Sequence, residues 1–150
     1  MKRALLIGLG LCARAWAPAE AADCTVDAKA EAARYAVEWS APKGYEPSSL
    51  TVELVYPPDR LTMPGNGAVP ADRWSDAPAQ AIVFAEDDGV RTKIVASKAG
   101  HIPAGRLLVV RYDRCKGAAA TAAADIRCSV TGCASAAGDV RNCTCTVVAP

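Results

Sequence analysis

Cysteine is the residue type with the clearest chemical potential in this sequence. Five of the seven cysteines lie in the last third of the chain: Cys115, Cys128, Cys133, Cys143 and Cys145. Four thiolates at Cys128, Cys133, Cys143 and Cys145 would suit zinc, but the single residue between the last two is not the usual spacing of a zinc motif. Disulfides are the alternative. They are favoured in a small exported chain with an even number of cysteines, and six remain here if Cys12 leaves with an N-terminal leader. We therefore expect disulfides, with no metal site and no cofactor.

The pairing of these cysteines depends on which strands become neighbours, and sequence alone does not fix it. Local geometry favours Cys133 with Cys143 or Cys145, across the last expected hairpin. Cys115 with Cys128 would close the alanine-rich residues 116–124, and Cys24 would take the remaining cysteine. Each bridge would stabilise the fold by ~2–4 kcal/mol.

Catalytic residue sets are hard to assemble from this chain. His101 is the sole histidine, and the Gly-x-Ser-x-Gly sequence of many serine hydrolases is absent. We interpret His101 as a solvated turn residue. Residues 86–88 are acidic, but they precede Gly89, as turn residues do, and they lack the ligand spacing of a calcium loop. No second acid across a cleft can be nominated for glycoside hydrolysis. The sequence predicts a protein that is not an enzyme.

Aromatic residues are the candidates for ligand contact, because flat rings stack on the apolar faces of sugars. Trp39 alternates with Tyr35 and Val37, a pattern that predicts a core position. Trp74 lies in an expected loop, where it either contacts a ligand or caps the core. Tyr45 follows Gly44 in an expected turn and is the second candidate contact.

The N-terminus has the features of a secretory signal peptide. Lys2 and Arg3 precede an apolar stretch at residues 4–13, and Ala19-Glu20-Ala21 is a small-residue cleavage site. The stretch is shorter than the ~20 residues that span a bilayer, so we expect no membrane span. We predict residues 1–21 as the signal peptide and residues 22–150 as a single domain, either secreted or periplasmic. Cys12 leaves with the leader unless it is a lipoprotein cysteine, for which Leu11 is an unfavourable preceding residue.

Charge argues against nucleic acid as a partner. The whole chain has a formal net charge of +1, and removal of the leader, with its three basic residues and one acidic residue, changes this to −1. No basic patch is evident, so neither nucleic acid nor an anionic membrane is an expected partner.

Short apolar segments separated by turn signals make up the remainder of the sequence. Alternating or continuous apolar patterns predict strands at residues 35–40, 50–56, 81–85, 90–96, 106–112, 126–130 and 143–148. Residues 64–79 are rich in Pro, Gly, Asn and Asp and predict a surface loop. A last hairpin is expected around residues 136–139, leading into residues 143–148. Eight or nine strands without a long helix predict an all-β, two-sheet antiparallel sandwich.

Three blocks of this pattern resemble a cohesin-type domain, in the superfamily that also holds family 2 and family 3 carbohydrate-binding modules. The blocks are a strand followed by Tyr56-Pro57-Pro58 and Leu61, the Ile102-Pro103-Ala104-Gly105 entry into the strand at 106–112, and the closing segment from Cys128 to Val147. The resemblance implies a jelly-roll sandwich with a non-catalytic binding role. Cohesins hold dockerin modules through one sheet face, and the related modules bind polysaccharides. Six mature cysteines are not typical of cellulosomal cohesins, so no interface residue is carried over.

These observations together predict a secreted, disulfide-stabilised binding domain. A protein partner engaged through a sheet face is the first expectation, and a polysaccharide bound at Trp74 or Tyr45 is the second. A small structural component of the cell envelope or surface is the third.

Overall fold

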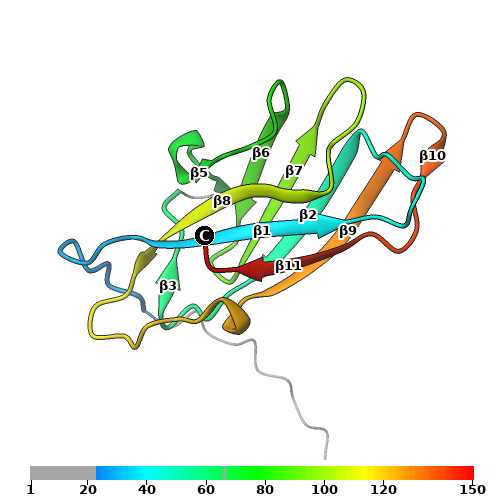
Figure 1. Cartoon of the computed structure of the whole chain (residues 1–150). Coiled ribbons are helices and arrows are strands. Elements are labelled where there is room, and N and C mark those ends of the chain that lie inside the picture. The colour runs from blue at the N-terminus through cyan, green and yellow to red at the C-terminus, as the bar shows by residue number, and fades with distance from the viewer. Residues whose placement is uncertain (1–22, 66) are drawn as a thin grey trace, which may run out of the picture.

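A computed structural model describes residues 23–65 and 67–150 and shows two antiparallel sheets packed face to face (Figure 1). The all-β, two-sheet sandwich predicted from the sequence is therefore confirmed. The predicted signal peptide, residues 1–21, lies outside the described residues.

One sheet has five strands in the order β11-β1-β8-β3, and β5 also pairs with β8. Its strands are β1 (Ala33–Ser40), β3 (Leu61–Thr62), β5 (Trp74–Ser75), β8 (Gly105–Arg114) and β11 (Thr144–Val148). The long pairing of β1 with β8 places Tyr35 opposite Val110 and Val37 opposite Leu108. These four side chains face inward, as the alternation in the sequence predicts.

The other sheet has six strands in the order β10-β9-β2-β7-β6-β4. Its strands are β2 (Ser49–Val55), β4 (Gly67–Ala68), β6 (Ile82–Asp87), β7 (Arg91–Ser97), β9 (Arg127–Ser135) and β10 (Gly138–Asp139). Leu50, Val52 and Leu54 on β2 are fully buried, whereas the intervening residues are only half-buried. Each fully buried aliphatic side chain stabilises the fold by ~1.5–3 kcal/mol.

Three tyrosines pack together in the core. The Tyr112 ring is fully buried, with its centroid 4.8 Å from that of Tyr56 and 6.2 Å from that of Tyr35. Trp39 is buried as predicted, and its indole N–H donates a hydrogen bond to the carbonyl of Pro103 at 2.9 Å. These four aromatic residues therefore serve the core.

The predicted surface loop at residues 64–79 is more ordered than its composition indicates. It contains the short strands β4 and β5 and a 3₁₀ turn, η1 (Ala71–Arg73). β4 pairs with the end of β6, and β5 pairs with the middle of β8. Strands of two residues form only because a longer strand offers them an edge, so the local sequence carries no signal for them.

The end of the chain departs from the predicted hairpin. β9 turns at residues 136–137 into β10, but the next strand, β11, does not pair with β9. β11 crosses to the other sheet and pairs with β1, where Val147 lies opposite Val37 and Cys145 opposite Trp39. The alternating pattern of residues 144–148 suits either sheet, because it specifies an inward face and not a neighbour.

This crossover decides two of the three disulfides. Cys133–Cys143 forms as one of the predicted alternatives, and Cys128 pairs with Cys145. The predicted Cys115–Cys128 bridge is wrong, because Cys115 pairs with Cys24 instead. Cys115 follows β8, where the N-terminal segment runs alongside and Lys116 N–H donates to the Thr25 carbonyl at 2.7 Å.

The two long sides of the sandwich differ as a result. On one side, β9 and β11 belong to different sheets and are linked by Cys128–Cys145, with Cys133–Cys143 nearby; we call this the cross-linked side. On the opposite side lie β4 and β6 of one sheet and β5 of the other, connected by residues 69–73 and 76–81 and by no disulfide among the described residues; we call this the open side (Figure 1).

Candidate functional site

The two aromatic residues nominated from the sequence lie apart in the structure. Trp74 is in β5, opposite Val110 of β8, and its half-buried side chain packs against the core. The expectation that it stands in an irregular loop is therefore wrong. Tyr45 lies between β1 and β2 and is 57% exposed. The hollow that Tyr45 lines does not include Trp74, so the two rings form no common platform.

Tyr45 borders a shallow hollow of about 320 Å³ at one end of the sandwich. Trp39, Ile102 and Pro103 line the same hollow, together with His101. The His101 Nδ1 atom lies 3.9 Å from the Glu46 carboxylate, and both side chains are exposed. His101 is thus a solvated residue, as predicted, and the hollow offers one exposed ring for stacking.

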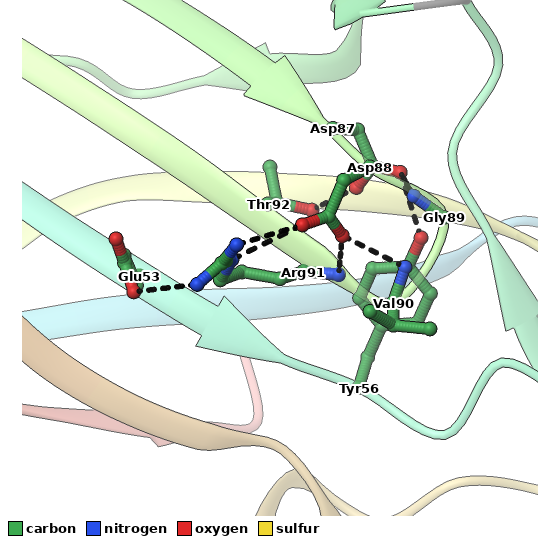
Figure 2. Close-up of polar contacts among 8 residues, drawn as sticks. All are labelled: Glu53, Tyr56, Asp87, Asp88, Gly89, Val90, Arg91 and Thr92. Carbon is green, nitrogen blue, oxygen red and sulfur yellow. Dashed lines mark hydrogen bonds and ion pairs between the residues drawn. The ribbon is translucent and has the colours of Figure 1, made fainter. Parts of the chain in front are cut away.

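The acidic residues before Gly89 close the β6–β7 hairpin (Figure 2). Asp87 Oδ1 accepts hydrogen bonds from the Tyr56 hydroxyl and the Gly89 N–H, each at 2.8 Å. Asp87 Oδ2 accepts a 2.6 Å bond from the Thr92 hydroxyl. Both oxygens of Asp87 are therefore used within the protein, at the end of β6 where the turn begins. Glu86, which the sequence also assigned to the turn, lies within β6 opposite Lys93.

Asp88 is used in the same way on the solvent side of the turn. Its Oδ1 accepts the N–H groups of Val90 and Arg91, and its Oδ2 accepts the Arg91 guanidinium at 2.9 Å. Burial alone would raise the pKa of Asp88, but these hydrogen bonds and the charge of Arg91 lower it below its ordinary value. Arg91 also reaches Glu53 of β2 at 3.6 Å, which links the hairpin to the next strand (Figure 2).

No metal site emerges from these acids. Within residues 23–65 and 67–150, no group of three or more His, Cys, Asp or Glu side chains is arranged to hold a metal ion. The four cysteines considered as zinc ligands are all in disulfides.

The same described ranges contain no helix long and apolar enough to cross a membrane.

A different surface, on β6 and β7, was missed by the sequence reasoning. Ile82 is 77% exposed and Phe84 is 49% exposed, and both point outward because residues two apart on a strand share a face. Half-buried Val95 of β7 lies directly opposite Phe84. We call Ile82, Phe84 and Val95 the apolar triplet.

Charged residues border the apolar triplet on the same face of the sheet. Glu86 of β6 lies opposite Lys93 of β7, which in turn lies opposite Glu53 of β2. Alternating charges in cross-strand positions attract one another, so this row is compatible with a stable, solvated sheet face. An apolar centre with a charged border is the composition of a protein interface.

The continuous apolar run at residues 81–85 predicted a strand but did not indicate that one of its faces meets solvent, and β6 lies near the edge of its sheet. A signal for this was present in the return strand, residues 91–97. There, Arg91 and Lys93 alternate with buried Thr92 and Ile94, which shows that one face of the hairpin meets solvent.

Comparisons with known proteins add no relative: no protein-family model, no curated protein and no solved structure matches the chain.

Proposed function

We propose that this protein is a non-catalytic binding domain that engages a protein partner through the outer face of β6 and β7. The observation that carries the proposal is the exposure of Ile82 and Phe84 on alternate residues of one strand, with Val95 beside them. A large aromatic ring exposed beside a β-branched residue has no role in the core. Contact with a partner would remove this apolar surface from water.

The border of the apolar triplet supports a protein as the partner. Charges of both signs lie close to Phe84 on β6, β7 and β2, at Glu86, Lys93 and Glu53 respectively. A partner with an apolar centre and a complementary charged border would gain orientation from these residues and affinity from the triplet. The cohesin-type resemblance, in which one sheet face holds a protein module, agrees with this proposal.

A polysaccharide ligand is the second candidate, and the exposed Tyr45 ring at the end of the sandwich favours it. Trp74 is no longer a comparable candidate, since its side chain packs against the core. A single ring in a shallow hollow offers one stacking contact, whereas the apolar triplet offers a continuous apolar surface.

Affinity capture with matched variants tests both candidates. The oxidised protein is immobilised and exposed to secreted proteins and wall polysaccharides of its source. We expect retention of a protein that is lost with Phe84→Ser and kept with Tyr45→Ser. Because both positions are exposed, both variants should fold as the parent does.

The opposite pattern would contradict the proposal. If Tyr45→Ser abolishes retention and Phe84→Ser does not, the binding site lies at the end of the sandwich. Retention of polysaccharide alone would then identify the domain as a carbohydrate-binding module.

A further inference from the structure

The charged rows beside the apolar triplet share one arrangement across the β6–β7 hairpin. Glu86 on β6 lies opposite Lys93 on β7, and both side chains are exposed. One row further, the Asp88 N–H donates to the Arg91 carbonyl at 3.1 Å, which places these two residues opposite each other at the turn (Figure 2). In both rows the acid stands on the β6 side and the base on the β7 side. A second hairpin laid on this face with β6 and β7 exchanged would therefore meet each acid with a base.

The apolar rows respond to the same exchange in a compatible way. Phe84 lies opposite Val95, and the highly exposed Ile82 lies opposite Ser97. With β6 and β7 exchanged, Phe84 of one hairpin would cover Val95 of the other, and Ile82 would cover the small Ser97. Large side chains placed over smaller ones can pack closely. The outer face of the hairpin is thus complementary to itself in both charge and size.

We propose, on the basis of the proposed function, that the protein partner of this face is a second copy of the chain. The two copies would lie face to face about a two-fold axis that runs parallel to the strands, midway between β6 and β7. This axis places β6 of each copy over β7 of the other and keeps the rows in register. Phe84 of each copy packs on Val95 of the other, and Glu86 of each copy pairs with Lys93 of the other. A two-fold dimer uses the same patch on both copies, which requires a patch of this kind.

Other two-fold axes through the same face bring less suitable groups together. An axis along β7 would stack Lys93 on Lys93 and place Glu86 over Glu53, because β2 and β6 flank β7. An axis across the strands at Phe84 would place Ile82 of each copy against Glu86 of the other. Like charges that meet, or a carboxylate that loses water to an apolar neighbour, disfavour both arrangements. The charges therefore select the axis between β6 and β7.

The contact resembles one that the fold already makes, but it is small. Sheets that pack face to face keep their strand directions within about 30° of each other, as the axis parallel to the strands allows. Three outward residues from each of the two strands contribute in each copy. A standard interface uses ~20–30 residues a side, so the dimer should dissociate on dilution.

Sedimentation equilibrium of the purified oxidised protein, without any other partner, tests the dimer. We expect the average mass to rise from one copy toward two as the concentration increases. Phe84→Ser should shift this rise to higher concentration, because it removes the largest apolar contact from both halves of the interface. A mass of one copy at all concentrations up to the millimolar range would overturn the proposal.

Exchange of the paired charges tests the position of the axis. Lys93→Glu and Glu86→Lys should each raise the dissociation constant at least about tenfold, because like charges then meet twice in every dimer. Thr131→Lys, on an exposed residue of β9, is the control and should dimerise as the parent does. All three positions are exposed, so the variants should fold as the parent does.

Charge complementation keeps the test decisive if a single variant loses stability. In an equal mixture of Lys93→Glu with Glu86→Lys, every contact between the two different chains joins opposite charges. The mixture should therefore form a mixed dimer with about the parent's affinity, and the double variant that carries both changes should dimerise alone. A mixture that stays monomeric would show that Glu86 and Lys93 do not meet across the axis and would overturn the proposal.

The outcomes separate the dimer from the proposed function. If the protein stays monomeric while a different protein is captured through Phe84, the dimer is wrong and the proposed function stands. If Phe84→Ser changes neither capture nor mass, both are wrong. If the captured species is this chain itself and Phe84→Ser abolishes its capture, both are supported.

Discussion

At the scale of single residues, the most constrained group is a buried chain of hydroxyls between the sheets. The Thr92 hydroxyl lies 2.6 Å from Asp87 Oδ2 and 2.8 Å from the Tyr112 hydroxyl, and Tyr56 bonds to the other Asp87 oxygen. Thr92 is the one polar residue among the fully buried residues that the structure describes. These bonds fasten the β6–β7 hairpin, which carries the apolar triplet on its outer face, to the core.

Replacing Thr92 with valine tests how much these buried hydrogen bonds stabilise the fold. Valine keeps the shape of threonine but leaves Asp87 and Tyr112 each short of a partner. Because unsatisfied buried polar groups are costly, we expect the free energy of unfolding to fall by ~1–3 kcal/mol. Chemical denaturation measures this, and Thr146→Val, at an exposed position of β11, should change it by less than about 0.5 kcal/mol. Equal effects of the two substitutions would show that the buried chain is not special.

Burial of Tyr56 and Tyr112 predicts how stability changes at alkaline pH. Desolvation raises the pKa of both phenols far above their ordinary value, and the Asp87 carboxylate contributes at Tyr56. A raised pKa in the folded state means that only the unfolded chain ionises just above pH ~10. Stability should therefore be complete below that pH and fall above it, by up to about 1.4 kcal/mol per pH unit for each tyrosine.

The contribution of Tyr56 to this fall can be separated. In Tyr56→Phe, the free energy of unfolding should start lower, since Asp87 loses a donor, but decline less steeply between about pH 10 and 11. Tyr45→Phe, at an exposed position, is the control and should keep the parent's slope. An unchanged slope in Tyr56→Phe would show that this phenol does not couple to folding.

At the scale of elements, the pairing of β2 with β9 depends on a close approach at Gly132. The register shifts between Thr51 and Val52, and Gly132 lies opposite Thr51. A Cβ atom at Gly132 would lie 3.1 Å from Thr51 Oγ1 and 3.2 Å from Thr51 Cβ. Both distances are tighter than ordinary contacts, so the glycine allows the two strands to meet here.

Gly132→Ala should therefore lower the free energy of unfolding by about 1–3 kcal/mol, through crowding against Thr51. The check is a double-mutant cycle by chemical denaturation with Thr51→Gly, which removes both crowded atoms. We expect Gly132→Ala to cost less in the Thr51→Gly background, so that the two effects are not additive. Additive effects would place the cost of the alanine elsewhere than in this contact.

At the scale of the whole molecule, the disulfides hold segments that are distant in sequence. Cys24–Cys115 has a sequence separation of 91 residues, against 17 for Cys128–Cys145 and 10 for Cys133–Cys143. Three intramolecular disulfides are typical of a protein that folds in an oxidising compartment. The two short-range bridges cross-link one side of the sandwich, and β6 lies on the opposite side, where no described disulfide links the sheets.

Loop entropy predicts unequal losses when these bridges are removed. Replacing both cysteines by alanine should cost about 4.5 kcal/mol for Cys24–Cys115 and about 3 kcal/mol for Cys133–Cys143. Guanidinium denaturation of the two double-alanine variants under oxidising conditions measures the difference. A larger loss from the Cys133–Cys143 pair would mean that contacts in the folded state, and not the unfolded chain, dominate.

The candidate binding surface was only partly accessible to sequence reasoning. Trp39 as a core residue and His101 as a solvated residue were predicted correctly, and so was the turn at Gly89, although Glu86 and Asp87 belong to β6. Alternation and turn chemistry are local properties. Phe84 was missed because an apolar run reads the same way in a central strand and in an edge strand. Its exposure depends on the strands that lie beside β6.

By itself, the sequence determined the longer strands, most of their inward faces and the two-sheet sandwich, because the two-residue period of a strand and the Pro and Gly signals of turns act over a few residues. Only the tertiary structure decided that β11 joins the sheet of β1, that Cys24 reaches Cys115, and that β6 lies next to the edge with only the short β4 beyond it. The physical reason is shared by all three. An amphipathic strand specifies which face is buried but not which strand lies beside it, and that choice rests on the packing of the whole core.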